Sequence, residues 1–203
     1  MTVVKVCGLK RPEDIEAVNE AGCDLAGFIF AKKSRRYVEP AHVSLLAGKL
    51  RSDIIPVGVF VNEDVNDVKE IMDISGIRMI QLHGSEDNAY IHQLRNVIGN
   101  SANILQAFRI DSEEDIEKVM NSEADLVLVD HGAGGTGESF DWSLLKNMKR
   151  DYLLAGGIGP ANVKEAIALL HPYGVDASSL LETEGVKDRQ KILDYVRNAK
   201  EAV

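Results

Sequence analysis

The sequence has few cysteines, few aromatic residues and no long apolar run. Its two cysteines, Cys7 and Cys23, have neither the spacing of a zinc site nor that of a CxxC redox pair. No apolar stretch is long enough to cross a bilayer, and Lys5 interrupts the apolar start that a secretory signal would need. We therefore expect a cytoplasmic protein without a bound metal.

Positive charge is also scarce. The chain has 23 Lys and Arg against 32 Asp and Glu, which gives a formal net charge of -9. This balance argues against nucleic acid or an acidic membrane as the main partner, because phosphate backbones require clustered cations. A small anionic substrate is compatible with it if backbone amides and a few local cations hold that substrate. Monomer and homodimer both stay open.

Short β-rich runs alternate with segments of helical period along the 203 residues, with no linker or low-complexity tract between them. The predicted strands are residues 2–7, 25–30, 54–61, 78–83, 103–110, 125–130, 152–157 and 174–180. The clearest predicted helices are residues 12–22, 65–76, 113–120 and 160–174. Pro12 and Pro160 fit a first helical turn, whereas Gly22, Gly76 and Gly174 fit helix ends.

Eight repeats of a strand and a helix, each of roughly 25 residues, predict a (β/α)8 TIM barrel. The chain is shorter than the ~250 residues usual for this fold, which compact loops would explain. A single catalytic domain over residues 1–203 is the simplest organisation. A doubly wound open sheet is the alternative, although fewer strands would then be expected.

Polar residues follow the predicted strands, at the end of a barrel where active sites lie. Asp130 stands where the apolar run "LVLV" meets a glycine-rich loop, and it suits either a simple turn or an acid at the barrel mouth. The other residues at strand ends are Lys5, Cys7, Gly8, Ser34, Arg35, Arg36, Asn62, His83, Gly84, Arg109, Gly156, Gly157, Ser178 and Ser179.

Seven motifs of the sequence resemble those of the phosphoribosylanthranilate isomerase family of tryptophan biosynthesis, and they occur in the order typical of that family. They are "KVCGL", "SRRYV", "GVFVN", "QLHG", "GGTGESFDW", "LAGGIGPANV" and "VDASS…EGVKD", spread from residue 5 to residue 188. The resemblance implies an Amadori rearrangement of N-(5'-phosphoribosyl)anthranilate to 1-(2-carboxyphenylamino)-1-deoxyribulose 5-phosphate. That reaction needs an acid and a base but no cofactor.

The resemblance also implies the roles of individual residues. Cys7 would be the base that removes the proton from C2, and Asp130 the acid that protonates the ring oxygen. A thiol needs a lowered pKa for this task and a carboxyl a raised one, and Lys5 lies on the same barrel face as Cys7. Taken singly, a strand-end cysteine also fits a small buried hydrophobe, and a strand-end aspartate fits a turn.

Two anionic groups of such a substrate need partners. The amides of Gly156 and Gly157, completed by Ser178 and Ser179, would hold the phosphate, although such glycines also suit ordinary turns. Arg36 matches the family arginine that positions the anthranilate carboxylate, to which a guanidinium binds well. His83 either lines the pocket or is simply packed and hydrogen-bonded.

Two other functions stay open. One is another phosphosugar-binding barrel enzyme. An epimerase would show metal-ligand histidines and aspartates at its strand ends, whereas indole-glycerol-phosphate synthase would show lysines and glutamates there. Neither set of residues is evident. The other is a barrel that binds without turnover or with impaired phosphate binding. The family pattern "SSG" here reads Ser178, Ser179, Leu180, and a leucine hinders close approach of an anion to the backbone.

Overall fold

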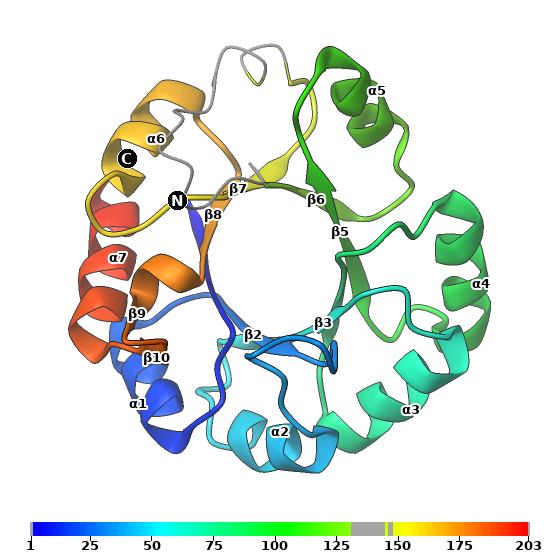
Figure 1. Cartoon of the computed structure of the whole chain (residues 1–203), viewed down its shortest axis with the longest axis horizontal. Helices are drawn as coiled ribbons and strands as arrows, with labels where there is room; N and C mark the ends of the chain where they lie inside the picture. Colours follow the sequence, from blue (N-terminus) through cyan, green and yellow to red (C-terminus); the bar gives the residue numbers. More distant parts are fainter. Residues whose placement is uncertain (1, 131–144, 146–147, 203) are drawn as a thin grey trace.

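Eight parallel strands pair in sequence order into a closed barrel, and helices surround them (Figure 1). The computed structural model describes residues 2–130, 145 and 148–202. The barrel strands are β1 (Val3–Cys7), β2 (Leu25–Ile29), β3 (Ile55–Phe60), β4 (Met79–Leu82), β5 (Asn103–Arg109), β6 (Leu126–Asp130), β7 (Tyr152–Ala155) and β8 (Gly174–Ala177). The predicted barrel is therefore confirmed.

The described helices form the outer ring of the molecule. They are α1 (Pro12–Ala21), α2 (Pro40–Ala47), α3 (Val65–Ser75), α4 (Asn88–Ile98), α5 (Glu113–Asn121), α6 (Val163–Leu170) and α7 (Arg189–Glu201). After β8 come a 3-10 turn, η2 (Ser179–Leu181), and a small hairpin of β9 (Glu182–Thr183) and β10 (Val186–Lys187). None of the described helices is long and apolar enough to span a membrane.

The two faces of the barrel strands have different neighbours. On β1, Val4 and Val6 face outward into the core beneath the helices, whereas Lys5 and Cys7 on the alternate positions face inward. A separate apolar cluster fills the inside of the barrel, and its members include Leu25, Val57, Met79, Leu105, Leu128 and Leu153. This plug leaves the carboxyl ends of the strands to form a cavity.

Two predicted elements have a boundary that differs from the structure by three residues or more. The last strand ends at Ala177 and not at residue 180, because Ser178 leaves the extended conformation (φ -133°, ψ -80°) and η2 follows. The helix expected over residues 160–174 covers only Val163–Leu170. Pro160 lies in the turn before it, where the Asn162 side chain bonds the loop backbone.

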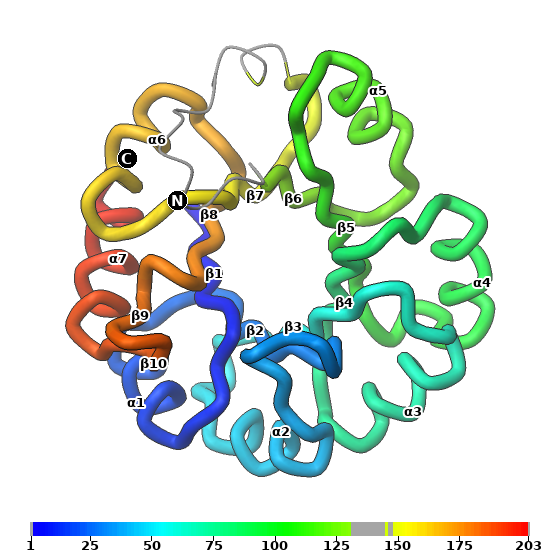
Figure 2. The backbone as a smooth tube through the Cα atoms, viewed as in Figure 1, coloured from blue at the N-terminus to red at the C-terminus, as the bar shows by residue number. Residues whose placement is uncertain are grey.

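The end of α6 explains the second error. His171 takes a left-handed conformation (φ 45°) as the helix cap, and Pro172 cannot continue the helix. Gly174 is then the first residue of β8. A Cβ there would lie 2.6 Å from the carbonyl oxygen of Val3, so this glycine allows β8 to approach β1. Figure 2 shows these two strands side by side although they come from opposite ends of the chain.

One ion pair lies inside the barrel between the first and last strands. Lys5 and Asp176 are register partners, and the Lys5 Nζ is 3.1 Å from the Asp176 Oδ1. The Lys5 side chain has no exposed surface, and that of Asp176 is 10% exposed. An ammonium group buried in this way stays charged only with a close carboxylate.

We expect Asp176→Asn to lower the free energy of unfolding by about 3–5 kcal/mol, because it leaves the buried Lys5 ammonium without a counterion. The double variant Lys5→Met/Asp176→Asn should be more stable than Asp176→Asn alone, since no unpaired charge remains. Urea unfolding followed by circular dichroism measures both values. A double variant that is no more stable than Asp176→Asn contradicts this account.

Candidate active site

A cavity of about 390 Å³ opens at the carboxyl ends of the barrel strands, a size suited to a small ligand. All eight residues that the sequence singled out for catalysis and binding line it. They are Cys7, Arg36, His83, Asp130, Gly156, Gly157, Ser178 and Ser179. The structure therefore brings these residues together from six strand ends, while their chemical roles remain predictions. The motif "GGTGESFDW" lies outside the described residues.

Cys7 ends β1 and is buried. The thiol packs against Gly27 of β2, where an added Cβ would lie only 2.8 Å from the Cys7 Sγ. Burial raises the pKa of the Cys7 thiol, while the Lys5 ammonium acts in the opposite direction. Lys5 thus assists as the sequence suggested, but its effect is smaller than that of burial. The net direction is opposite to the one that a base requires.

On the other side of the cavity, His83 and Asp130 face each other. The His83 Nε2 lies 3.8 Å from the Asp130 Oδ2, and both side chains are partly exposed. The His83 Nδ1 is 2.9 Å from the Nε2 of Gln81, which lies two residues earlier on β4. If the amide nitrogen donates this bond, Nδ1 is the acceptor and the Nε2 of a neutral imidazole carries its hydrogen toward Asp130. His83 is therefore both hydrogen-bonded and part of the cavity wall.

The loop after β7 carries Gly156 and Gly157 into the cavity wall. Their φ angles are 80° and 67°, a region that glycine adopts without strain. Asn162 fixes the loop from behind, because its Nδ2 donates to the Gly157 carbonyl (2.8 Å) and its Oδ1 accepts from the Gly159 N–H (2.9 Å). The glycines thus occupy a shaped loop, where backbone can approach a ligand closely.

The loop after β8 contributes Ser178, Ser179 and Leu180. The Ser178 hydroxyl donates to the Cys7 carbonyl at 3.0 Å, so this side chain joins β8 to β1. Leu180 lines the cavity and is 47% exposed. Its Cβ would lie 2.9 Å from a Cβ added to Gly159, so it leans on the neighbouring glycine loop. Leu180 is not among the described residues with positive φ, so its backbone does not require glycine.

Arg36 reaches the cavity from the loop after β2 and is held by a carboxylate. Its Nε and Nη2 bond the two carboxylate oxygens of Glu182 at 2.5 and 3.0 Å. The neighbouring Arg35 also pairs with Glu182, but its side chain is 64% exposed and it does not line the cavity. Arg109 pairs with Asp111 and likewise lies outside the cavity wall.

Four polar residues at the site were missed in the sequence. Gln81 and Asp176 line the cavity, and alternation along β4 and β8 places them on the inward face, two residues before His83 and Ser178. Glu182 and Lys187 lie in the motif "LETEGVK", which reads as a surface loop. No local signal shows that their side chains are almost completely buried.

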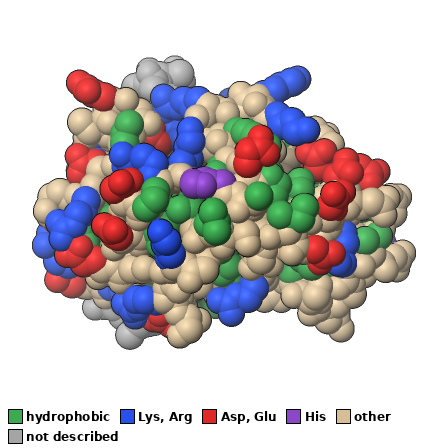
Figure 3. Space-filling view, turned by 90° about the horizontal axis from the view of Figure 1, so that it is seen from below, with side chains coloured by type: hydrophobic (Ala, Val, Ile, Leu, Met, Phe, Trp, Pro, Cys, Tyr) green, Lys and Arg blue, Asp and Glu red, His purple; other side chains and the backbone are tan. Residues whose placement is uncertain are grey.

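No group of three or more acidic, histidine or cysteine side chains suited to a metal was found within the described part of the chain. On the molecular face shown in Figure 3, acidic and basic side chains are interspersed. That face therefore carries no continuous basic surface of the kind that nucleic acid requires.

Comparison with known proteins gives a consistent result. Residues 4–198 match the family model described as N-(5'phosphoribosyl)anthranilate (PRA) isomerase. The chain is 40% identical over 213 aligned residues to the N-(5'-phosphoribosyl)anthranilate isomerase of Acetivibrio thermocellus, covering 100% of this chain and 97% of that one. It is also 40% identical to the isomerase of Clostridium acetobutylicum, with 97% of each chain covered.

Solved structures agree. The phosphoribosyl anthranilate isomerase from Thermotoga maritima superposes with a TM-score of 0.90 at 33% identity, covering 99% of this chain and 100% of that chain. A further isomerase, solved in complex with reduced 1-(o-carboxyphenylamino)-1-deoxyribulose 5-phosphate, gives 0.88 at 32% identity over 99% and 100% of the two chains. With the barrel and its lining residues, these matches show that the chain belongs to the N-(5'-phosphoribosyl)anthranilate isomerase family.

Proposed function

We propose that the cavity isomerises N-(5'-phosphoribosyl)anthranilate to 1-(2-carboxyphenylamino)-1-deoxyribulose 5-phosphate, the reaction of its family in tryptophan biosynthesis. The observation that carries this proposal is that Cys7 and Asp130 line one cavity from strands three steps apart round the closed barrel. A phosphosugar between them would meet one group on each side. The protein would act in the cytoplasm as a monomer or homodimer.

In this proposal the two groups move two different protons. Asp130 gives its proton to the furanose ring oxygen, which breaks the C1–O bond and opens the ring. Ring opening leaves a C1=N iminium, and Cys7 takes the proton from C2, so that the C–H electrons form a C1=C2 double bond while the C=N pair returns to nitrogen. The resulting enol becomes the ketone when C1 gains a proton and the hydroxyl on C2 loses one. Both transfers are general acid–base steps, and no redox or group-transfer partner is involved. The His83 side chain lies beside Asp130 and faces the same space.

The proton must therefore be on Asp130 and not on Cys7, although carboxyls are ordinarily more acidic than thiols. Because burial raises the pKa of Cys7, the thiolate is a minor form of the protein at neutral pH. The Lys5 ammonium stabilises that thiolate and so increases its share. Burial also excludes water from the thiol, which makes the thiolate a stronger base when it forms.

The remaining residues would hold the two anionic ends of the substrate. Arg36 suits the carboxylate of the anthranilate ring, because a guanidinium binds a carboxylate through two N–H groups. The Gly156–Gly157 loop, with Ser178 and Ser179, suits the phosphate. Since the Ser178 hydroxyl donates to the Cys7 carbonyl, we assign its contribution to the backbone N–H.

The proposed roles of Cys7 and Asp130 predict that Cys7→Ser and Asp130→Asn each lower kcat by roughly 10²- to 10⁴-fold, because each removes a proton-transfer group. The decay of fluorescence of freshly made phosphoribosylanthranilate measures turnover, and circular dichroism checks the fold. Wild-type protein must first consume the substrate, or the proposed function itself fails. Either folded variant that keeps most of the wild-type kcat refutes its assigned role.

The raised pKa of Cys7 predicts how the thiol reacts with iodoacetamide. Only the thiolate reacts, so the midpoint of the rate against pH reports the pKa whatever the steric access. We expect a midpoint above the ~8.5 of an exposed cysteine. Mass spectrometry of the Cys7 peptide separates it from Cys23, whose pKa burial raises to about 12. A midpoint below about pH 8 contradicts the predicted direction.

Leu180 provides a test of the phosphate site. If its side chain keeps an anion away from the Gly156–Gly157 loop, Leu180→Gly should tighten inorganic phosphate binding and raise kcat/KM by about tenfold, with kcat unchanged. Leu180→Ala should give most of this gain, because the backbone here does not need a positive φ. Calorimetry and initial rates measure both effects. Values that stay within about twofold of the parent would mean that the leucine is a neutral variation.

A further inference from the structure

A small hairpin after β8 holds a buried carboxylate beside Arg36. Its strands, β9 and β10, are joined by Glu184 and Gly185, whose φ angles of 52° and 80° fit a two-residue hairpin turn. Glu182 and Lys187 are direct register partners across this hairpin, so their side chains lie on one face. The Lys187 Nζ is 2.9 Å from the Glu182 Oε1, and the two side chains are 2% and 5% exposed.

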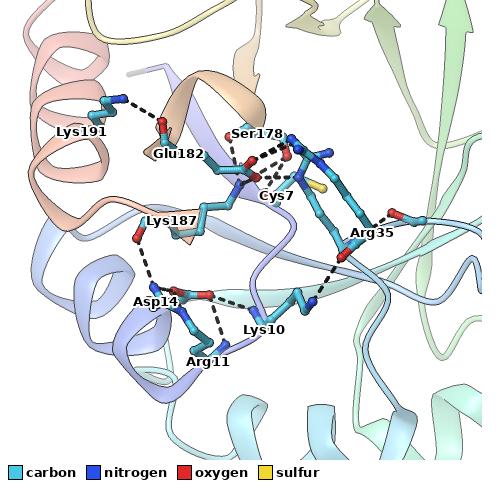
Figure 4. A network of polar contacts seen from close by, with 11 residues as sticks. Cys7, Lys10, Arg11, Asp14, Arg35, Ser178, Glu182, Lys187 and Lys191 are labelled. Atoms are coloured by element: carbon cyan, nitrogen blue, oxygen red, sulfur yellow. Dashed lines mark hydrogen bonds and ion pairs between the residues drawn. The ribbon is translucent and has the colours of Figure 1, made fainter. Parts of the chain in front are cut away.

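The hairpin is fixed on several sides (Figure 4). The Lys187 Nζ also donates to the Ser178 carbonyl at 2.9 Å, and the Lys191 Nζ donates to the Glu182 carbonyl at 2.7 Å. Burial alone would raise the pKa of Glu182, but hydrogen bonds from Arg36 and Lys187 hold it below its usual range. Glu182 is therefore an ionised carboxylate in a fixed position.

Arg36 is held between this carboxylate and Gly8, the residue that follows β1. Its stem crosses Gly8, where an added Cβ would lie 2.6 Å from the Arg36 Cδ. Glu182 accepts one hydrogen from Nε and one from Nη2. A guanidinium has five N–H groups in one plane, so three remain, and two of them, one on Nη1 and one on Nη2, point out along the edge formed by these two atoms. Fixing one edge of a planar group also fixes the direction of the other.

We propose that Glu182 is a positioning residue that aims the Nη1–Nη2 edge of Arg36 at the carboxylate of the substrate. This rests on the proposed function, in which Arg36 binds the anthranilate carboxylate. Glu182 would thereby favour substrates whose aromatic ring carries a carboxylate, because a pre-aimed guanidinium loses less freedom on binding. In the opposite role, Glu182 would compete with the substrate carboxylate for Arg36, and Arg36 would have to release Glu182 before the substrate binds. Lys187 and the hairpin keep Glu182 in place, which argues against that role.

The two roles predict effects of opposite sign in Glu182→Gln. The ligands are reduced 1-(o-carboxyphenylamino)-1-deoxyribulose 5-phosphate, which carries both anionic groups, and inorganic phosphate. For a positioning residue, calorimetry should show about tenfold or more weaker binding of the first ligand, since a charge-assisted fork is lost. Phosphate binding should stay within about twofold. In turnover, KM should rise more than kcat falls.

A double-variant cycle with Arg36→Met isolates the route of the effect. If Glu182 acts through Arg36, adding Glu182→Gln to Arg36→Met should weaken ligand binding no further. Arg35→Met is the matched control, because Arg35 also pairs with Glu182 but lies outside the cavity wall, and its loss should leave both affinities unchanged. If Glu182→Gln does not fold, Glu182→Asp decides, since it keeps a charge opposite Lys187 while drawing the carboxylate back from Arg36.

Several results would overturn the proposal. They are tighter or unchanged binding of the reduced ligand by the folded Glu182 variant, an equal loss of phosphate binding, and additive losses in the double variant. A wild-type protein that does not bind the reduced ligand also overturns it. Wild-type protein that binds this ligand without consuming phosphoribosylanthranilate refutes the proposed function alone, and the Glu182 proposal is then judged on the binding data.

Discussion

The pairing of β1 with β8 closes the sheet, and the geometry of the cavity depends on it. Lys5 and Asp176 meet across this pair although 171 positions separate them in the chain, and so do the Cys7 carbonyl and the Ser178 hydroxyl. A slip of one residue in register would turn Lys5 and Cys7 outward to the helices. The close approach at Gly174 and the buried ion pair both favour the observed register.

The cations around the cavity are paired with carboxylates before any ligand arrives. Lys5 is paired with Asp176, whereas Arg36 and Lys187 share Glu182. The Lys5–Asp176 and Lys187–Glu182 pairs are buried, so removing one member would leave a charge that the interior cannot solvate, whereas the Arg36 side chain is 19% exposed. This half of the site, built from β1, β8 and the loops beside them, is therefore organised in advance. The half that holds His83 and Asp130 is more open to solvent, with side chains 40% and 32% exposed.

Much of the fold and site follows from local sequence. Alternating strands and helices predict the barrel, and polar residues after each strand predict the cavity wall, because parallel strands place their carboxyl ends at one end of the barrel. The predicted end of β8 was wrong because the conformation of Ser178 depends on its hydrogen bond to β1. The predicted start of α6 was wrong because the conformation of Asn162 depends on its hydrogen bond to the glycine loop. The burial of Glu182 depends on a hairpin folding back over Arg36, which periodicity does not encode.

Asp176 shows a different limit of prediction from the sequence. It lies inside the motif "VDASS", and alternation places it on the inward face, but its partner is Lys5 at the other end of the chain. Only closure of the barrel identifies a carboxylate that neutralises Lys5 and also opposes ionisation of Cys7. The pKa of the thiol is therefore set by burial and by opposing charges, with Asp176 raising it and Lys5 and Lys187 lowering it, and the residues next to Cys7 in the sequence do not reveal this balance.

A protein with a net charge of -9 must bind a proposed substrate that carries a carboxylate and a phosphate. Long-range attraction does not help it, so binding must rely on short-range donors that are already in position. The structure offers two kinds: a loop with positive-φ glycines, where a bare backbone can approach the ligand, and a guanidinium held along one edge. Both present N–H groups without adding a mobile cation. In the proposed site, the ion pair with Glu182 would direct the guanidinium, Asn162 would fix the glycine loop, and the N–H groups of both would supply the affinity.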